Sequence, residues 1–416
     1  MSPERAAVPA LPRAFRCFWW GEAVSGFGNA VTGLALQTLV VVTLGGTAVQ
    51  VGWLNAARWL PYLVVGLVVG ALVDRVRRRP VMVATDLLRA LLLALVPFAW
   101  ALGVLSLPLL LGVVLAFGAA SLVNDAASQS FVPRLVPRPS LQRAHARLDG
   151  AAAVAQTAGP AVAGLLVRLV GAPLAVLVDA ASYAFSAAVV ASLPDVVEPS
   201  RVRDRLTARD LAGQVVEGVR WVYGRSGLAR LAVATHVWFV AQAVLLVVAA
   251  PYAFLRLHLS ALQLGLVYAV AGVGALVGAV VSTAVGRRVG TGGAIVTAHL
   301  TSAVGALVML AALAASVGWP GAAVLAAGQL LHGWAMGLSN SHEMSYRQAL
   351  TPDALQARTN TTMRSLNRAV VVVVSPLAGL GADRFGYGWA LGAVAAVFTL
   401  SGMLLLLSPF RRARAG

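Results

Sequence analysis

The chain has 416 residues, of which 59% are apolar and only 11% are charged. A soluble domain carries about 25% charged residues, and no soluble core of this size could bury roughly 245 apolar side chains; a soluble protein is therefore excluded. The net charge is +17 and all 32 basic residues are arginines, so chemistry that needs a lysine, as in a Walker A loop or a Schiff base, is excluded too. Cys17 is the only cysteine, which excludes an intramolecular disulfide.

Apolar runs that are broken by glycine, proline and charged residues recur along the whole chain. A helix that crosses a bilayer needs about 20 apolar residues, and the runs predict twelve such helices. The first run is too long for the core of a cleaved signal peptide, so we expect it to be retained. The predicted spans are residues 16–44, 50–73, 80–101, 107–127, 149–170, 173–194, 228–250, 262–286, 293–316, 321–343, 364–383 and 387–408.

The arginines indicate the orientation of these spans. If both termini are cytoplasmic, 25 of the 32 arginines lie in cytoplasmic segments and three in outer loops, while the other four fall within spans. This bias is the positive-inside pattern of proteins in the cytoplasmic membrane. The basic loops show no motif for nucleic acid, so their charge is interpreted as topology and as contact with the lipid bilayer.

A polar stretch near the middle divides the chain into residues 1–194, 195–227 and 228–416. The apolar spacing from Leu206 to Tyr223 predicts an amphipathic helix on the inner membrane surface. The outer two parts resemble each other, because each has a Leu-Gln pair followed about 20 residues later by a proline within a helix, at Pro160 and Pro376. Two such six-helix bundles predict a substrate site near the midplane between them.

Several motifs give the chain a family resemblance. Residues 70–79, which read GALVDRVRRR, resemble the motif A loop of the major facilitator superfamily, with Arg77 where the family usually has glycine. The segments DLLR at 86–89, FVPRLVP at 131–137 and SYRQALTP at 345–352 look like the branch that holds macrolide-efflux and siderophore-export proteins. Residues 159–164, GPAVAG, are similar to the antiporter motif of drug exporters, with Ala163 in place of one glycine.

The resemblance implies an all-α polytopic membrane protein whose twelve transmembrane helices form two pseudo-symmetric six-helix bundles. It also implies alternating access, driven by a proton gradient. We therefore expect a proton-driven exporter of amphipathic small molecules (a drug, macrolide or siderophore-like compound). The alternatives are a proton-coupled symporter that imports a metabolite and a membrane sensor that transports nothing. The predicted partners are a small-molecule substrate, protons and lipid; the chain is expected to be a monomer and not an enzyme.

Carboxylates in or near the spans are the candidates for proton coupling, because a charge inside a bilayer costs about 2.5–3.5 kcal/mol. They are Glu22, Asp86, Asp125 and Asp149. A salt bridge to a neighbouring helix is the alternative for Glu22, and pairing with nearby arginines is the alternative for Asp125 and Asp149. Asp86 also stands three residues before Arg89, a spacing that favours contact on a helix.

A second set of polar and aromatic residues is predicted to line the substrate cavity: Glu22, Asn29, Arg58, Trp59, Asn340 and Glu343. Glu22 and Asn29 share one face of the first helix because they are seven residues apart. Arg58 is a cation for an anionic substrate group or, alternatively, an ion-pair partner of Asp179. Glu343 is also expected to pair with Arg364 or Arg368.

The family motifs imply a third set, which acts in gating: Gly70, Asp74, Arg75, Arg78, Arg79, Arg89, Gly159, Pro160, Arg364 and Arg368. In the motif A pattern the glycine allows close packing, and the aspartate contacts a helix of the second half when the inner gate closes. His236, His299 and His332 fall within spans but lack metal-ligand spacing. We interpret these histidines as packing residues, and we expect neither a metal nor a cofactor.

Overall fold

The computed structural model describes residues 10–73, 76–194, 208–224 and 227–414, and every regular element in these ranges is helical. The first half of the chain forms α1 (Arg13–Thr38), α2 (Ala48–Val64), α3 (Gly66–Val73), α4 (Arg78–Ala101), α5 (Leu107–Leu135), α6 (Leu141–Val170) and α7 (Ala172–Ser192). After α8 (Ala208–Tyr223), the second half forms α9 (Ala229–Pro251), α10 (Ala261–Ala311), α11 (Trp319–Leu350) and α12 (Gln356–Leu406).

Two of these helices are long enough to cross a bilayer twice. α10 and α12 have 51 residues each, and their helical backbone is interrupted at Gly290 (φ 76°) and Gly386 (φ 86°). Glycine adopts this positive φ without a steric penalty, so the chain turns back there. Eight helical stretches have the length and hydropathy of membrane spans. When α10 and α12 are divided at their glycines and α2 is joined to α3, the described residues contain twelve α-helical segments besides α8, which fits the predicted number of spans.

Several helices extend beyond the predicted spans. α6 begins at Leu141 where a span was expected from residue 149, α11 continues to Leu350, and α12 begins at Gln356 where the span was expected from residue 364. Hydropathy marks only the part of a helix that contacts lipid tails, whereas polar residues extend the same helix into the aqueous phase. The predicted spans are therefore shorter than the helices that contain them.

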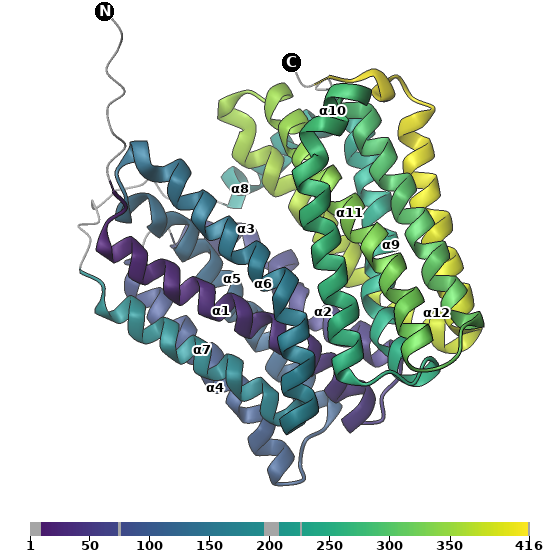
Figure 1. The fold of residues 1–416 in the computed structure, drawn as a ribbon. Coiled ribbons are helices and arrows are strands. Elements are labelled where there is room, and N and C mark those ends of the chain that lie inside the picture. Colours follow the sequence, from purple (N-terminus) through teal and green to yellow (C-terminus); the bar gives the residue numbers. More distant parts are fainter. Residues whose placement is uncertain (1–9, 74–75, 195–207, 225–226, 415–416) are drawn as a thin grey trace, which may run out of the picture.

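The helices form two bundles (Figure 1). α1 and α4 to α7 pack against one another in the first bundle, and α9 to α12 do so in the second. The most extensive contacts between the bundles are made by two helix pairs, α2 with α12 and α6 with α10. Figure 1 shows the bundles converging at the end opposite the chain termini, which we call the far end, and diverging toward the termini.

The two helix pairs are built from one repeated sequence pattern. α2 begins with Thr47-x-x-Gln50-x-Gly52 and α10 with Ser260-x-x-Gln263-x-Gly265. In each case the glutamine Oε1 accepts a hydrogen bond from the backbone N–H of the first residue, at 2.7 Å for Thr47 and 2.8 Å for Ser260. These capping boxes fix where both helices begin. Gly52 and Gly265, each five residues after the capping residue, therefore lie at the same distance from the N-terminus of their helices.

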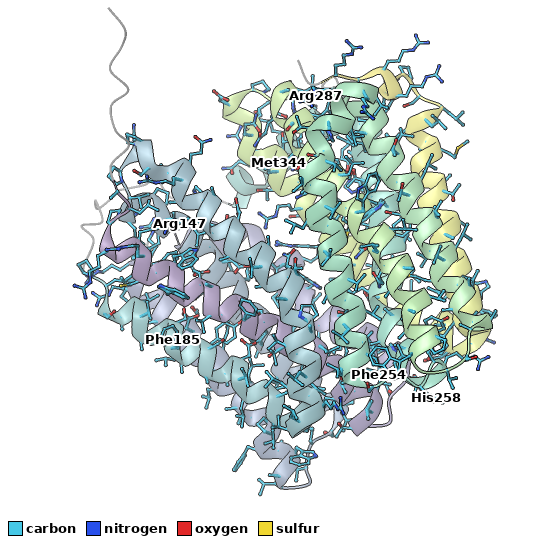
Figure 2. All side chains as sticks on the ribbon, in the orientation of Figure 1. Arg147, Phe185, Phe254, His258, Arg287 and Met344 are labelled. Atoms are coloured by element: carbon cyan, nitrogen blue, oxygen red, sulfur yellow. The ribbon has the colours of Figure 1, made fainter. Side chains whose placement is uncertain are left out.

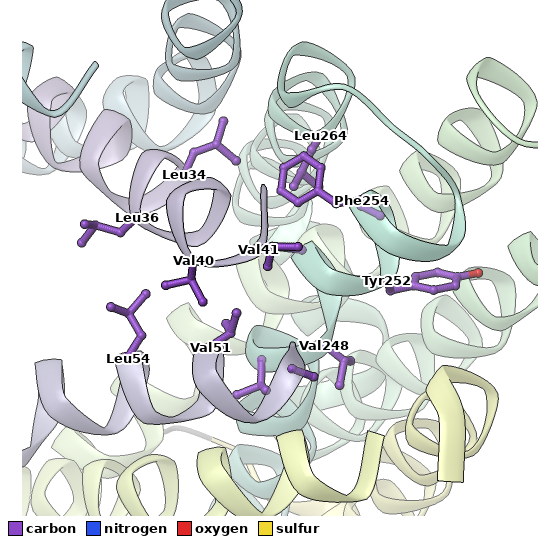
Figure 3. Close-up of a cluster of buried hydrophobic side chains, with 14 of the residues drawn as sticks. Leu34, Leu36, Val40, Val41, Val51, Leu54, Val248, Tyr252, Phe254 and Leu264 are labelled. Atoms are coloured by element: carbon purple, nitrogen blue, oxygen red, sulfur yellow. The ribbon is translucent and has the colours of Figure 1, made fainter. Parts of the chain in front are cut away.

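At these glycines the helix backbones are in direct contact. A Cβ on Gly52 would lie 2.4 Å from the carbonyl oxygen of Ser375 in α12, and a Cβ on Gly265 would lie 2.3 Å from that of Pro160 in α6. Glycine is therefore required for the close approach. Next to these contacts, apolar side chains from both bundles form one buried cluster, as Figure 3 shows for Leu34, Val41 and Val51 of the first half with Val248 and Leu264 of the second. The far end is closed in this structure.

The segment between the bundles contains α8, which agrees with the helix predicted to end at Tyr223; residues 195–207 lie outside the described residues. α8 packs on the second bundle, where Glu217 forms an ion pair with Arg358 of α12. Gly218 brings α8 close to the same helix, since a Cβ there would lie 2.4 Å from Thr362 Oγ1.

Candidate substrate cavities and gates

A cavity of about 510 Å³ lies between the bundles. Its wall comes from α1, α2, α5 and α6 of the first half and from α9 and α10 of the second, and it includes Arg58 and Trp59. Tyr268 of α10 donates a hydrogen bond to Gln37 Oε1 of α1 at 3.4 Å, so the cavity is bridged by a polar contact between the bundles. The structure thus places two of the predicted cavity residues, Arg58 and Trp59, on this wall.

A second cavity, of about 480 Å³, adjoins the first, because Gln156 of α6 lines both. It lies between α6 and the helices α9, α10 and α11, and its wall includes Asn340 and Glu343 as predicted. Trp238 and Phe239 of α9 give this wall an aromatic surface. Among the described lining residues of the second cavity, Glu343 alone carries a charge.

Glu22 and Asn29 line neither of these two cavities. Asn29 Oδ1 accepts a hydrogen bond from the Tyr183 hydroxyl at 2.8 Å, and Glu22 Oε1 accepts one from Ser128 at 3.3 Å. Both side chains therefore face other helices of the first bundle. The shared helix face was predicted, but the direction in which it points could not be obtained from spacing alone.

The alternative pairing of Arg58 with Asp179 does not occur, because the described residues show no ion pair within 4 Å between them. The Arg58 guanidinium lies 6.0 Å from the centre of the Phe117 ring. Asp179 is fully buried and accepts a hydrogen bond from Ser182 at 2.9 Å. Arg58 thus remains available at the cavity wall.

The candidate carboxylates of the first bundle have different surroundings. Asp86 forms a buried ion pair with Arg89 and accepts a hydrogen bond from Asn124 at 3.1 Å. Asp125 accepts one from the Tyr62 hydroxyl at 2.7 Å, and Asp149 is exposed on α6.

Arg89 also lies 4.1 Å from the centre of the Tyr183 ring, whose hydroxyl reaches Asn29. A single polar network therefore joins α4, α5, α7 and α1 inside this bundle, and Arg89 holds Asp86 within it rather than contacting the second half.

The predicted gate at the termini end is only partly described. Asp74 and Arg75 lie outside the described residues, and Gly70 belongs to α3. Arg79 donates hydrogen bonds to the carbonyl oxygens of Val190, at 3.2 Å, and Ala191, near the end of α7. A cation at the carbonyl end of a helix is favourable.

Arg78 is buried, with its Nε 3.5 Å from Ser130 Oγ of α5. The contacts that the structure gives for Arg78 and Arg79 lie within the first bundle. These contacts attach the start of α4 to α5 and α7. Figure 2 places Arg147 and Arg287 at the same end and His258 at the far end.

Gly159 and Pro160 lie at two helix contacts of α6. A Cβ on Gly159 would lie 2.5 Å from the Ala30 Cβ of α1, and the Pro160 carbonyl lies at the Gly265 crossing described above. These residues let α6 approach α1 on one side and α10 on the other. The structure therefore gives the proline motif a place at the contact between the bundles.

The expected pairing of Glu343 with Arg364 or Arg368 is wrong. Arg364 is exposed, and the Arg368 guanidinium lies 4.3 Å from the Tyr62 ring centre and 5.5 Å from that of Trp59. The reason is that Arg368 lies on the face of α12 that packs against α2 and not on a face toward α11. These cation–π contacts join the two bundles.

Glu343 instead faces His299, with 3.5 Å between Oε1 and Nε2. The sequence, which predicts a packing role for His299, contains no signal that connects this histidine to a carboxylate 44 positions later.

Asp383 is a further residue that sequence reasoning missed. Its carboxylate accepts hydrogen bonds from Thr47 Oγ1 at 2.6 Å, from the backbone N–H of Ala48 at 3.1 Å and from that of Val49 at 3.0 Å. An acid of the second bundle thus caps the N-terminus of α2 in the first. Its position at the end of a predicted span gave no indication of this, although the repeated pattern at Thr47 marks the helix start that it caps.

We expect Asp383→Ala to open the far end more often. Loss of a helix cap costs about 1 kcal/mol, which corresponds to about a fivefold shift in population. The measurement uses spin labels on Val104→Cys and Val317→Cys in a Cys17→Ser background, because both positions are exposed and lie in far-end loops of opposite bundles. Opening of the far end would appear as a larger fraction of molecules with a long distance between the two labels. Arg384→Ala is the matched control, and equal distance distributions for both variants would contradict the role of the cap.

The fold and the cavities define a transporter with two bundles around a central pathway, and comparisons agree. The model of the Major Facilitator Superfamily matches residues 18–319. The chain therefore belongs to the major facilitator superfamily, whose members are membrane transporters and not enzymes.

The most similar curated proteins include efflux pumps. The multidrug efflux pump Tap of Mycobacterium tuberculosis is 30% identical over 293 residues, which cover 67% of this chain and 68% of Tap. Macrolide efflux protein A of Streptococcus pyogenes is 27% identical over 232 residues, or 54% of this chain and 55% of that protein. The resemblance to the macrolide-efflux branch is confirmed.

Solved structures show the same fold at low sequence identity. A bacterial homologue of the iron transporter ferroportin, in an inward-facing state, has a TM-score of 0.77 at 16% identity and covers 97% of this chain and 100% of its own. A D-xylose-proton symporter has a TM-score of 0.70 at 16% identity, with 96% and 98% covered. The predicted fold class is thus confirmed.

Proposed function

We propose that the protein is a proton-driven exporter of amphipathic small molecules that works by alternating access. The observation that carries this proposal is the pair of adjoining cavities between the bundles, next to a far end that is closed. A site between two bundles that is closed on one side is the arrangement that alternating access requires. We further propose that the protein acts as a monomer, with residues 1–194 and 228–416 as the two moving units.

The charge distribution supports an orientation with both termini in the cytoplasm. Figure 2 places Arg147 and Arg287 at the termini end, and both belong to the arginine-rich segments that the positive-inside rule assigns to the cytoplasm. In this orientation the closed far end faces outward, and the cavities receive substrate from the cytoplasm or the inner leaflet. The first step of export would begin from such a state.

The cavity walls support an amphipathic substrate. Trp59, Trp238 and Phe239 provide aromatic surface, while Arg58 and Glu343 place one charge of each sign on separate walls. Pockets that are mainly apolar with few polar groups bind ligands that have an apolar body and a polar group. The printed names of the relatives, a multidrug pump and a macrolide pump, point to the same class of substrate.

The test is the direction of flux relative to the proton gradient in proteoliposomes. With an acidic lumen, we expect ethidium and radiolabelled erythromycin to accumulate at least tenfold above empty liposomes, and nigericin to abolish the accumulation. Random insertion does not affect this result, because an antiporter moves substrate toward the acidic side in either orientation.

Accumulation only with an alkaline lumen would instead identify a symporter, a function that the fold also supports through its likeness to the D-xylose-proton symporter. If neither probe is transported under either gradient, both the exporter and the symporter would be contradicted.

A further inference from the structure

A histidine and a carboxylate face each other inside the second bundle. His299 lies on the part of α10 that follows Gly290, Glu343 lies on α11, and 3.5 Å separates Nε2 from Oε1. The histidine side chain is 1% exposed, whereas the glutamate is 18% exposed and lines the second cavity. Ionisable residues in a membrane interior are functional candidates when they are paired in this way.

The hydrogen bonds around His299 fix its tautomer. Ser401 Oγ lies 2.7 Å from the carbonyl oxygen of Ala234 and 2.8 Å from His299 Nδ1. A serine hydroxyl has one hydrogen, and a carbonyl oxygen can only accept, so Ser401 donates to Ala234 and accepts from the histidine. Nδ1 therefore carries a hydrogen in every protonation state, and Nε2, which faces Glu343, is the atom that gains or loses a proton.

The Glu343 carboxylate is held in place by hydrogen bonds from two other side chains. Ser339 donates to Glu343 Oε1 at 2.5 Å and Thr235 of α9 donates to Oε2 at 3.1 Å. With one proton between Nε2 and the carboxylate the pair is neutral, and without it the pair has a net charge of −1. Because Nε2 and Oε1 face each other at 3.5 Å, the pair can share this one proton.

The other two histidines within the spans have hydrogen-bond partners other than Glu343. His332 of α11 is held between Gln242 Oε1 at 2.9 Å and Ser302 Oγ at 3.3 Å, and His236 of α9 contacts Tyr223 and Asn367.

Arg347 follows Glu343 by one turn on α11 and directs Nη2 toward Met344 Sδ at 3.0 Å. From α12 the neighbour of His299 is the uncharged Ser401. Nε2 of His299 is thus the basic atom that faces Glu343 from another helix.

We propose that His299 and Glu343 together bind the transported proton, and that they exchange it with the second cavity. The cavity wall connects the pair to the substrate, because Trp238 lines the cavity, lies 6.3 Å from the His299 ring and stacks on His332 at 5.8 Å. Loss of the proton leaves a negative charge on the cavity wall, where an otherwise uncharged lining is described. This assignment rests on the proposed proton-driven transport.

Transport assays of single variants test the coupling role. We expect Glu343→Gln and His299→Gln to lose accumulation of ethidium driven by the pH gradient at least tenfold. Exchange of ethidium at equal pH, which needs no net proton movement, should stay within twofold of the unmodified protein in His299→Gln, because this side chain is 1% exposed and does not line the cavity. The matched control is His342→Gln, the residue next to Glu343 that contacts the Ser282 carbonyl at 3.0 Å instead.

A second measurement needs no substrate. Nitrogen-15 NMR of histidine-labelled protein in lipid nanodiscs should show one ring, absent from His299→Gln, in which Nδ1 stays protonated between pH 5 and 9 while Nε2 titrates. Full gradient-driven accumulation in Glu343→Gln, or a bare Nδ1 in this ring, would overturn the assignment. If instead the NMR result holds but the unmodified protein accumulates no probe, the proposed export fails while the proton-binding pair stands.

Discussion

Replacing Gly379 with alanine is expected to prevent closure of the far end and to reduce transport at least tenfold. A Cβ at this position would lie 2.4 Å from both the Ala48 carbonyl oxygen and the Val49 Cα of α2, so helix backbones would have to separate. Overpacking costs about 1–3 kcal/mol. An energy of this size shifts a two-state equilibrium about 5- to 150-fold, here toward the state with an open far end.

The matched control for this substitution is Gly392→Ala in the same helix, where no heavy atom lies within 4 Å of the added Cβ. Both changes gain helix propensity, so a difference between them reports the contact with α2 alone. Spin-label distances between the far-end loops and ethidium accumulation would be measured for both variants. Normal accumulation by Gly379→Ala would show that this crossing separates without cost.

The second large effect is expected for Arg89→Ala. The ion pair with Asp86 is buried, so removing the arginine leaves a carboxylate without its cation in the interior of the first bundle. Breaking a buried pair in this way costs about 3–5 kcal/mol. We expect a lower unfolding temperature in detergent and less folded protein in the membrane.

Arg168→Ala removes an exposed arginine of α6 and is the control for loss of charge alone. Arg89→Ala combined with Asp86→Leu should recover part of the lost stability, since the uncompensated charge is then absent. An unfolding temperature for Arg89→Ala equal to that of Arg168→Ala would show that the pair contributes nothing to stability.

The fold was largely predictable because each bilayer segment leaves its own apolar run in the sequence. The arginine bias predicted an orientation in the same direct way, and the motif at residues 70–79 indicated the family that the comparisons confirm. These signals are local or additive along the chain. They do not depend on which way any single side chain points.

The site was less predictable, because side-chain direction in a helix changes by about 100° per residue. Arg368 was expected to meet Glu343, yet it faces Tyr62 across the α2 contact. The histidine that does meet Glu343 comes from a different helix, and the hydrogen bonds that fix its tautomer come from a third. Pairings of this kind depend on helix rotation and packing, which one sequence does not encode in any short pattern.

The glycine crossings at the far end have a consequence for energy coupling. The backbone contacts at these glycines contain no group that gains or loses a proton. The strength of these contacts is therefore the same in acidic and neutral solution. Sensitivity to the gradient must then originate in ionisable groups outside these glycine contacts, which include the Asp383 cap of α2 and the His299–Glu343 pair. Variants at Gly52 or Gly265 should therefore change how much substrate leaks without changing the pH at which transport is half-maximal.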